Sequence, residues 1–480
     1  MRTLDSIGDT VYSSGGGVGS SRGVSRRGNS IGDGREVAVS PRQFDQYPIY
    51  KDSEIEWLDK IPVHWGVKRL KFSAPLRTSK LDTKPDDKVY VGLKHVESWT
   101  GRLLLEPQPE RVDGVMLSFR AGEVLLGKLR PYLAKVARPD FDGVCTSEIL
   151  VLRPMPRCLQ GYIMYFLLNE SQVLWLNSLT YGAKMPRVSP EQVGNSLVTL
   201  PSVPEQHAIA AFLDRETTKI DGLIEQKERL IELLGEKRTA LITHAVTHGL
   251  DPTAPVKDSG IEWLDKIPAH WEIKRMKHVS VVENSGEFGA EPGECAIDLP
   301  VCTTAHLTAA GVFLVDDMPV RSFSGEEASR YVGVPGDLFV VKSSGSNTNI
   351  ITGKLGLVTN TTPRIVFSNF LLRIRPSAKA VFPSFLAYLL RSALTRERIR
   401  KMVATTTYPN INVSEYVGSA LALPGVDEQK HIAAFLDRET AKIDGLVAKI
   451  RQAIDLLKEY RVALISAAVT GKVDVREVAA

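Results

Sequence analysis

The sequence lacks the features that mark several large classes of protein. Its 480 residues contain four cysteines, Cys145, Cys158, Cys295 and Cys302, and no Cys-x-x-Cys pair. This small, irregular set excludes a disulfide framework and a zinc site of the usual cysteine spacing. There is no run of 18 apolar residues for a membrane span, and the N-terminus has no apolar core of a signal peptide. We therefore expect a soluble cytoplasmic protein without a membrane partner.

Catalytic signatures are missing as well. The chain has neither a GxxxxGK[ST] phosphate loop nor an HExxH zinc helix. No Pro-Pro-aromatic motif of amino-methyltransferases and no carboxylate cluster of a nuclease is present. Cys145 and Cys158 have no histidine near them in the sequence, which argues against a thiol nucleophile. We expect no catalytic residue, no metal site and no cofactor in this chain.

The net positive charge of the chain is small, and it is unevenly distributed along the sequence. Sixty Lys and Arg against 56 Asp and Glu leave a net charge of +4. Residues 68–190 carry +7 and residues 274–414 carry +5, whereas residues 204–250 carry −2. Two basic regions on either side of a weakly acidic one suggest contact with the phosphates of DNA.

What the chain does contain is an internal duplication. The segment KDSEIEWLDKIPVHWGVKRLK begins at Lys51 and returns as KDSGIEWLDKIPAHWEIKRMK at Lys257, 206 residues later. A second segment, LPSVPEQHAIAAFLDRETTKIDGL from Leu200, returns as LPGVDEQKHIAAFLDRETAKIDGL from Leu423, 223 residues later. A period above 200 residues is too long for a solenoid, so the chain consists of two related halves.

The duplication predicts five parts. Residues 1–47 are rich in Gly, Ser and Arg with little apolar periodicity, and we expect a flexible leader there. Residues 48–203 and 250–426 are expected to form one domain each. Residues 204–249 and 427–480 hold one long helix each, the second followed by a short tail. The bodies of the two domains do not repeat in sequence.

Each helical segment carries an apolar stripe with a seven-residue spacing. This stripe predicts that the two helices pack on each other as a coiled coil, and an amphipathic helix lying on its own domain is the alternative. Roughly 40 residues at about 1.5 Å each make a rod of about 60 Å. We assign the helix seam and the surface that docks a partner to Leu213, Ile220, Leu223, Leu230, Leu234, Leu241, Leu436, Ile443, Ile450, Leu457 and Leu464.

Each domain body is expected to be a mixed α+β unit with a twisted sheet. Short apolar runs bounded by Gly, Pro or Asp predict strands, and a longer apolar segment in each body predicts a helix before a polar loop. The expected strands are residues 89–93, 123–126, 149–152, 338–341, 355–358 and 370–374, and the expected helices are residues 161–179 and 383–402.

Polar loops after these elements carry side chains suited to DNA. Arg and Lys match guanine edges and Asn matches adenine edges, although turn chemistry explains the asparagines equally well. The candidate DNA-binding residues are Lys94, Lys128, Arg130, Tyr132, Lys184, Arg187, Lys342, Ser343, Asn347, Asn349, Lys354, Tyr408 and Asn410. The repeated aromatic and histidine residues are interpreted as structural: Trp57, Trp65, Trp263, Trp271, His64 and His270.

Together these segments resemble the specificity subunits of type I restriction–modification systems. The matching motifs are IEWL-x-x-IP-x-HW at Ile55 and Ile261, GEVLLGKLRPYLAK at Gly122, GVCTSEILVLRP at Gly143, and LP-x-x-x-EQ-x-x-I-A-x-F-L-D at Leu200 and Leu423. The resemblance runs from about residue 47 to the C-terminus. It implies an α+β fold with a pseudo-two-fold internal duplication, in which two target-recognition domains are joined by two long antiparallel coiled-coil helices.

The resemblance also implies a function. Each domain would read one half of a split, asymmetric sequence in double-stranded DNA. The repeated parts would dock two methyltransferase (modification) subunits, with restriction subunits added, and only these partners would bind S-adenosylmethionine, ATP and Mg. Two alternatives stay open, a fused type I-like or type IIG-like enzyme with an unrecognised catalytic site and a coiled-coil scaffold.

Overall fold

The computed structural model describes residues 44–105, 112–182, 184–308, 310–343, 351–403 and 410–476. Most of the leader predicted for residues 1–47 therefore lies outside the described residues. Its last residue, Tyr47, is only 3 % exposed and is part of the folded first half. The predicted end of the leader is wrong at this residue, because burial of its aromatic ring ties it to the domain that follows.

The first repeated segment folds into a β-hairpin in each half. Both hairpins are antiparallel, and both have an irregular register just before the turn. Their strands are β1 (Tyr50–Ile55) with β2 (Leu58–Pro62), and β12 (Val256–Ile261) with β13 (Leu264–Pro268).

A short strand after each hairpin pairs with the last strand of the same domain body. These antiparallel pairs bring the start and the end of each body together, next to the long helix. The pairs are β3 (Gly66–Arg69) with β11 (Leu197–Leu200), and β14 (Glu272–Arg275) with β22 (Ala420–Leu423).

The first domain body contains two small sheets. A four-stranded sheet has the order β4-β6-β9-β5, with β5 parallel to β9, and a three-stranded sheet has the order β10-β7-β8. The strands are β4 (Lys80–Thr83), β5 (Val89–Val91), β6 (Asp113–Phe119), β7 (Val124–Gly127), β8 (Val136–Ala137), β9 (Gly143–Thr146) and β10 (Ile149–Leu152). The helices are α1 (Leu70–Ser73), η1 (Leu93–His95), η2 (Pro131–Leu133), α2 (Gln160–Leu167), α3 (Glu170–Ser178) and α4 (Pro190–Asn195).

The second body follows a related plan although its sequence does not repeat the first. The run β21-β18-β19 corresponds to β10-β7-β8, and the parallel pair β16/β20 corresponds to β5/β9. The strands are β15 (Ser280–Glu283), β16 (Ile297–Cys302), β17 (Val320–Phe323), β18 (Leu338–Val341), β19 (Leu355–Leu357), β20 (Val366–Phe367) and β21 (Leu371–Pro376). The helices are η3 (Thr304–His306), η4 (Val315–Asp317), α6 (Met276–Val279), α7 (Gly325–Tyr331), α8 (Pro383–Arg391), α9 (Ala393–Val403) and α10 (Val413–Val417).

The helix predicted near the end of each body is broken into two. In the first domain, Asn169 caps the start of α3 by accepting a hydrogen bond from Ser171 N. In the second, Ser392 leaves helical geometry and its Oγ accepts from Thr395 N at the start of α9. Asn and Ser side chains compete with the helix for backbone groups, which favours them as caps. The prediction of single helices was therefore wrong.

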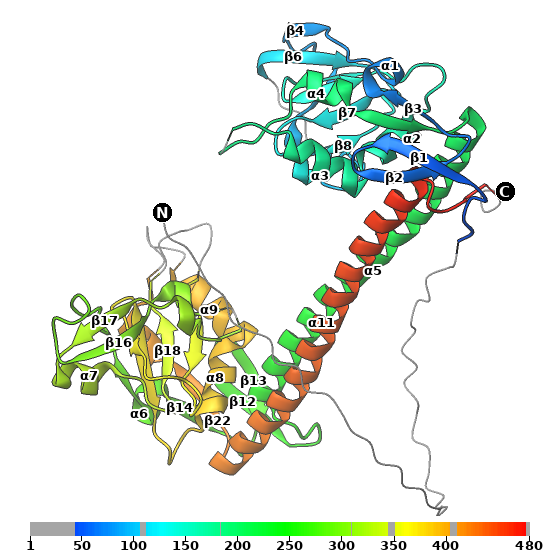
Figure 1. The fold of residues 1–480 in the computed structure, drawn as a ribbon. Helices are drawn as coiled ribbons and strands as arrows, with labels where there is room; N and C mark the ends of the chain where they lie inside the picture. Colours follow the sequence, from blue (N-terminus) through cyan, green and yellow to red (C-terminus); the bar gives the residue numbers. More distant parts are fainter. Residues whose placement is uncertain are drawn as a thin grey trace, which may run out of the picture. The chain divides into compact units, whose positions relative to one another are not determined.

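The second repeated segment forms the two long helices, α5 (Val203–His248) and α11 (Val426–Val469), which lie side by side (Figure 1). They run antiparallel. Asp221 near the start of α5 pairs with Arg461 near the end of α11, and Arg238 further along α5 pairs with Asp444 nearer the start of α11.

Most of the predicted seam residues are covered, but two are not. Leu436 joins the core of the second domain, so the first turns of α11 pack on their own domain, as the alternative prediction has it. Leu223 and Leu230 are 46 % and 42 % exposed, so they lie outside the helix seam, and their assignment to the surface that docks a partner stays a prediction. When only two helices pack together, each covers one edge of the broad apolar stripe on the other, and the second edge stays exposed to solvent. Buried residues are Leu213, Ile220, Leu436, Ile443, Ile450 and Leu464, and half-buried ones are Leu234, Leu241 and Leu457.

Arg461 joins both helices to the first domain. Its buried guanidinium donates to Asp221 Oδ1 (3.0 Å) and to the carbonyl oxygens of Trp99 (2.6 Å) and Thr100 (2.8 Å). The equivalent in the other half is Arg238, which pairs with Asp444 at a position open to solvent. The duplicated arginine thus binds three acceptors at a buried position in one half, and forms a single ion pair at the surface in the other.

We expect Arg461→Ala to lower the free energy of unfolding by about 2–3 kcal/mol, because it leaves buried acceptors without a donor. Arg238→Ala is the matched control and should cost less than about 1 kcal/mol, as exposed ion pairs contribute little. Urea unfolding followed by tryptophan fluorescence measures both. Equal losses in the two variants would contradict this assignment.

Candidate nucleic-acid interface and docking surface

Two loops of the first domain that were predicted to contact DNA lie against each other. One loop, residues 128–134, follows β7, and the other, residues 181–188, follows α3. Leu129 and Arg187 form a β-bridge between them. We call these two segments the first loop pair.

The backbone of the first loop is held in an unusual conformation. Arg130 and Ala134, on either side of the 3-10 turn η2, have φ angles of 51° and 44°. Left-handed backbone is costly for residues other than glycine and gathers at functional sites. The side chains of Arg130 and of Tyr132 are exposed, the latter by 43 %. The loop therefore presents a cation and an aromatic ring to solvent.

The sequence reasoning missed a carboxylate at the centre of this loop pair. Glu148 lies between β9 and β10, and its Oε1 is 3.9 Å from Lys128 Nζ and 3.5 Å from Arg187 Nη2. The three side chains are 23 % to 41 % exposed. Glu148 belongs to the run GVCTSEIL, but nothing in the sequence marks its carboxylate as facing two cations.

The second domain brings its two predicted loops together in the same way. Ser343 and Asn410 form a β-bridge, and Ile411 N donates to Lys342 O at 2.9 Å. In the first domain Val188 N makes the matching bond to Lys128 O at 3.0 Å. We call Lys342–Ser343 with Asn410–Ile411 the second loop pair.

The other candidate DNA-binding residues are placed differently. Lys94 is exposed in η1 and Lys184 is exposed in the first loop pair. Lys342 and Lys354 are both half-buried, and each ammonium donates to a backbone carbonyl, Asn284 O at 2.9 Å and Leu307 O at 3.4 Å, so their contact with DNA stays a prediction. Lys135 holds the carbonyls of the first domain in the same way. Three predicted residues lie outside the described ranges: Asn347, Asn349 and Tyr408.

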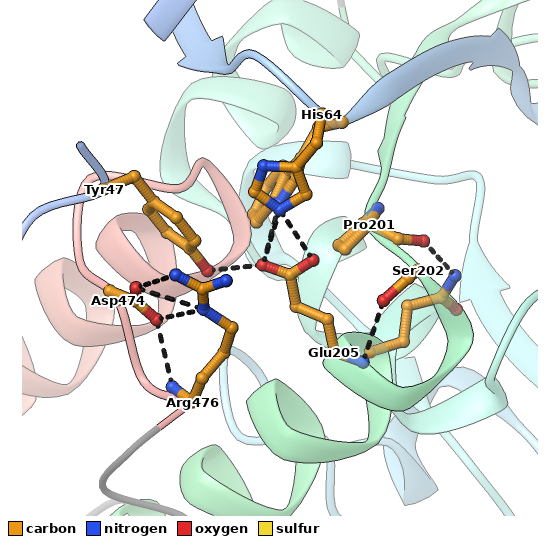
Figure 2. Close-up of polar contacts among 9 residues, drawn as sticks. Tyr47, His64, Pro201, Ser202, Glu205, Asp474 and Arg476 are labelled. Carbon is orange, nitrogen blue, oxygen red and sulfur yellow. Dashed lines mark hydrogen bonds and ion pairs between the residues drawn. The ribbon is translucent and has the colours of Figure 1, made fainter. Parts of the chain in front are cut away.

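A buried carboxylate fixes the start of α5 to the first hairpin (Figure 2). Glu205, 4 % exposed, accepts hydrogen bonds from Tyr47 Oη (2.8 Å) and Trp65 Nε1 (3.0 Å), and its Oε2 is 3.1 Å from His64 Nε2. Burial and the bond to Glu205 raise the pKa of Tyr47 far above its ordinary value. The guanidinium of Arg476 lies 5.0 Å from the centre of the Tyr47 ring, so the end of the described chain covers this site.

The second half repeats this arrangement with fewer contacts. Glu428 accepts from Trp271 Nε1 at 3.1 Å, and its Oε2 is 2.8 Å from His270 Nε2. The residue equivalent to Tyr47 is Thr253, and the Glu428 side chain is 33 % exposed. Trp65 and Trp271 are fully buried, which agrees with their interpretation as core anchors.

Further polar side chains of the repeated segment hold each domain to its long helix. Gln206 accepts from Leu159 N just before α2, at 2.8 Å. About two helical turns further along α5, Asp214 Oδ1 accepts from Tyr165 Oη of α2 at 2.7 Å. The second half has the equivalent bonds of Gln429 to Phe382 N and of Tyr388 to Asp437. The residues that repeat in the sequence of the two long helices thus make equivalent hydrogen bonds in the two halves.

The middle of the helix pair presents apolar side chains to solvent. No residue of α5 between Ile220 and Ile242 is buried. The exposed residues include equivalent positions of the two helices, Leu223 with Leu446 and Leu233 with Leu456. Large apolar side chains that a long helix exposes to solvent are candidates for contact with another protein. We call these four leucines the helix surface.

A cluster that could hold a metal ion, or a reactive thiol, would mark a candidate catalytic centre among the described residues. No group of three or more His, Cys, Asp or Glu side chains among them is arranged to hold a metal ion. Burial raises the pKa of Cys145 and of Cys302 to about 12, so these thiols stay protonated near neutral pH. Among the helices in the described ranges, none has the length and apolar content that a bilayer crossing requires.

Comparison with known protein families and sequences relates the chain to one group. The family described as type I restriction modification DNA specificity domain matches residues 119–233. The MjaVIII specificity subunit of a type I restriction enzyme of Methanocaldococcus jannaschii is 23% identical over 362 residues, covering 74% of this chain and 77% of that protein. The EcoKI specificity subunit of Escherichia coli K12 is 22% identical over 375 residues, covering 77% of each.

A solved structure shares the fold. It comes from a study of complex assembly and conformational transition of the type I R-M system, and it covers 86% of this chain and 99% of its own. The TM-score is 0.61 at 19% sequence identity. The α+β fold class and the resemblance predicted from the sequence are confirmed by these comparisons.

The carboxylate at the start of α5 should stabilise the first half more than its counterpart stabilises the second. Glu205→Ala leaves the buried Trp65 and Tyr47 donors unpaired and should cost about 2–4 kcal/mol. Glu428→Ala, the matched control, leaves one buried donor in a more open site and should cost about half as much. Urea unfolding of the full chain measures both losses. A larger loss for Glu428→Ala would contradict the comparison.

Proposed function

Because the chain is similar to type I specificity subunits along most of its length, we propose that it is the DNA-recognition subunit of a type I restriction–modification complex. The observation that carries this proposal is that each domain has a loop pair of the same backbone arrangement. The same backbone arrangement occurs in both domains and presents basic and polar side chains, and each domain has a positive net charge. Arrangement and charge together suit contact with a DNA duplex.

The proposed target is split and asymmetric. Two related domains, residues 47–203 and 250–426, would each place one loop pair against DNA. The second loop pair has Ser343 and Asn410 at its bridge where the first has Leu129 and Arg187, so the two half-sites should differ in sequence. Contacts on one side of a duplex recur about every 10–10.5 base pairs, which sets the expected separation of half-site centres. The long helices, α5 being roughly 70 Å at about 1.5 Å per residue, would hold that separation.

The helix surface is proposed to dock two methyltransferase subunits. Its leucines occur at equivalent places on α5 and α11, as two copies of one partner would require. Restriction subunits would join the same complex. In this proposal the chain itself does no catalysis, and S-adenosylmethionine, ATP and Mg belong to the partner subunits. A cytoplasmic location goes with this function.

Within the first loop pair we propose a division of labour. Arg130 and Arg187 contact base edges, and Lys128 and Lys184 contact phosphates. A guanidinium can bind a guanine edge with two hydrogen bonds, whereas an ammonium acts mainly as a point charge.

Selection from a random DNA pool by the full chain tests the proposed function. The parent should select a split site whose two halves differ. Arg130→Ala should relax one position of one half-site by about 1–3 kcal/mol. Lys184→Ala should weaken binding to all sequences alike and flatten the salt dependence. Lys80→Ala, an exposed lysine of β4 outside the loops, is the control and should match the parent. Selection of a palindromic or continuous site would contradict the proposal.

The docking proposal predicts the stoichiometry of the complex. Mixed with the modification subunit, the parent chain should bind two copies in light scattering. Leu223→Ser with Leu233→Ser should remove one copy, and Leu446→Ser with Leu456→Ser should remove the other. Leu174→Ser, which alters an exposed leucine of α3, is the control and should keep both. A two-to-one complex in all variants would place the dock elsewhere.

A further inference from the structure

One position beside the loop pairs carries very different side chains in the two domains. In the first, Lys128 N donates to Glu148 O at 3.0 Å, just before β10. In the second, Lys342 N donates to Phe370 O at 3.0 Å, just before β21. The backbone bond is the same, so Glu148 and Phe370 occupy one structural position with a carboxylate in one domain and an aromatic ring in the other.

Glu148 differs from the structural carboxylates of these domains. Glu123 is bound by Arg77 at 2.7–3.0 Å, and the equivalent Asp337 is bound by Arg375 at 2.7 Å. Such short, two-pronged pairs fix a fold. The cations beside Glu148 stay at 3.5 Å or more, and its Oε2 is buried without a hydrogen-bond partner in the described part of the chain. This oxygen is covered in the free chain, so Glu148 can accept a bond from a DNA base only when Lys128 and Arg187, at 3.9 and 3.5 Å, move aside.

The chemistry of base edges limits what Glu148 can accept. An ionised carboxylate is only an acceptor. In the major groove the donors are the amino groups of cytosine N4 and adenine N6, while guanine and thymine present acceptors at the matching places. Lys128 and Arg187 are held loosely enough to move to DNA phosphates or to a neighbouring base, which would free Glu148 toward the groove.

Phe370 suits a different base. Its side chain is 55 % exposed next to Lys342. An exposed ring has no donor or acceptor for a base edge, but it can pack on the methyl group of thymine. The same position would then read a polar group in one half-site and an apolar group in the other.

We propose that this position determines sequence specificity in both domains. Glu148 accepts a hydrogen bond from the amino group of cytosine or adenine, and Phe370 packs on a thymine methyl group. The proposal rests on the proposed DNA-recognition function and adds the base chemistry that each domain reads at this position.

The test is selection from a random DNA pool by the full chain and its Glu148→Ala variant. One position in one half-site should lose discrimination by about 5- to 150-fold, with the other half-site unchanged. Asp140→Ala, which removes an exposed carboxylate elsewhere in the first domain, is the matched control for charge and should keep the parent's preferences. Glu148→Gln then separates the two bases, because an amide prefers adenine: a cytosine position should change to adenine, and an adenine position should persist.

The same selection experiment with a variant of the second domain tests the other half of the proposal. Phe370→Ala should relax one thymine position in the other half-site and leave the first unaffected. The inference is overturned if the Glu148→Ala variant keeps every base preference, or if its affinity changes by one factor for all sequences. Glu148 would then be only a counter-ion for Lys128 and Arg187. A parent that selects no sequence at all overturns the proposed function itself, and this inference with it.

Discussion

The architecture depends on polar side chains that begin each long helix. Glu205 and Glu428 accept the indole N–H of a fully buried tryptophan, and the glutamine that follows each of them binds the backbone before α2 or α8. A buried carboxylate is costly unless its oxygens are satisfied. Glu205 therefore holds hairpin, domain and helix in one arrangement, since a displacement would leave its charge and its donors unpaired, whereas Glu428, 33 % exposed, makes the same bonds in a more open site.

The sequence predicted the repeated parts well because repetition is itself evidence. Two copies of one segment report the same environment twice, and a seven-residue apolar spacing over forty residues has few explanations other than a packed long helix. The sequence predicted neither the breaks at Asn169 and Ser392 nor the exposure of Leu223 and Leu230. A cap depends on one local hydrogen bond, and exposure depends on what else covers the stripe.

The sequence predicted the common order of strands, helix and polar loop in the two domain bodies, but not the sheet topology that they share. Strands such as β7 and β18 need only apolar side chains on their buried faces, so Val124–Gly127 and Leu338–Val341 share a sheet position with little identity. The same freedom hid Glu148, which has no sequence neighbour to mark it, and nothing in the sequence indicated that the Lys354 ammonium reaches a backbone carbonyl. Charge alone cannot separate an inward lysine from an outward one.

The duplication shows which parts of the site can change and which cannot. The loop pairs are joined by backbone hydrogen bonds, Val188 N to Lys128 O in one domain and Ile411 N to Lys342 O in the other. Bonds between backbone groups do not depend on side-chain identity. The side chains on and beside these loops can therefore differ between domains, Arg187 against Asn410 on the loops and Glu148 against Phe370 beside them, without altering the scaffold that presents them. Under the proposed function, this separation would let each domain take its own base preference while the helix anchors stay the same.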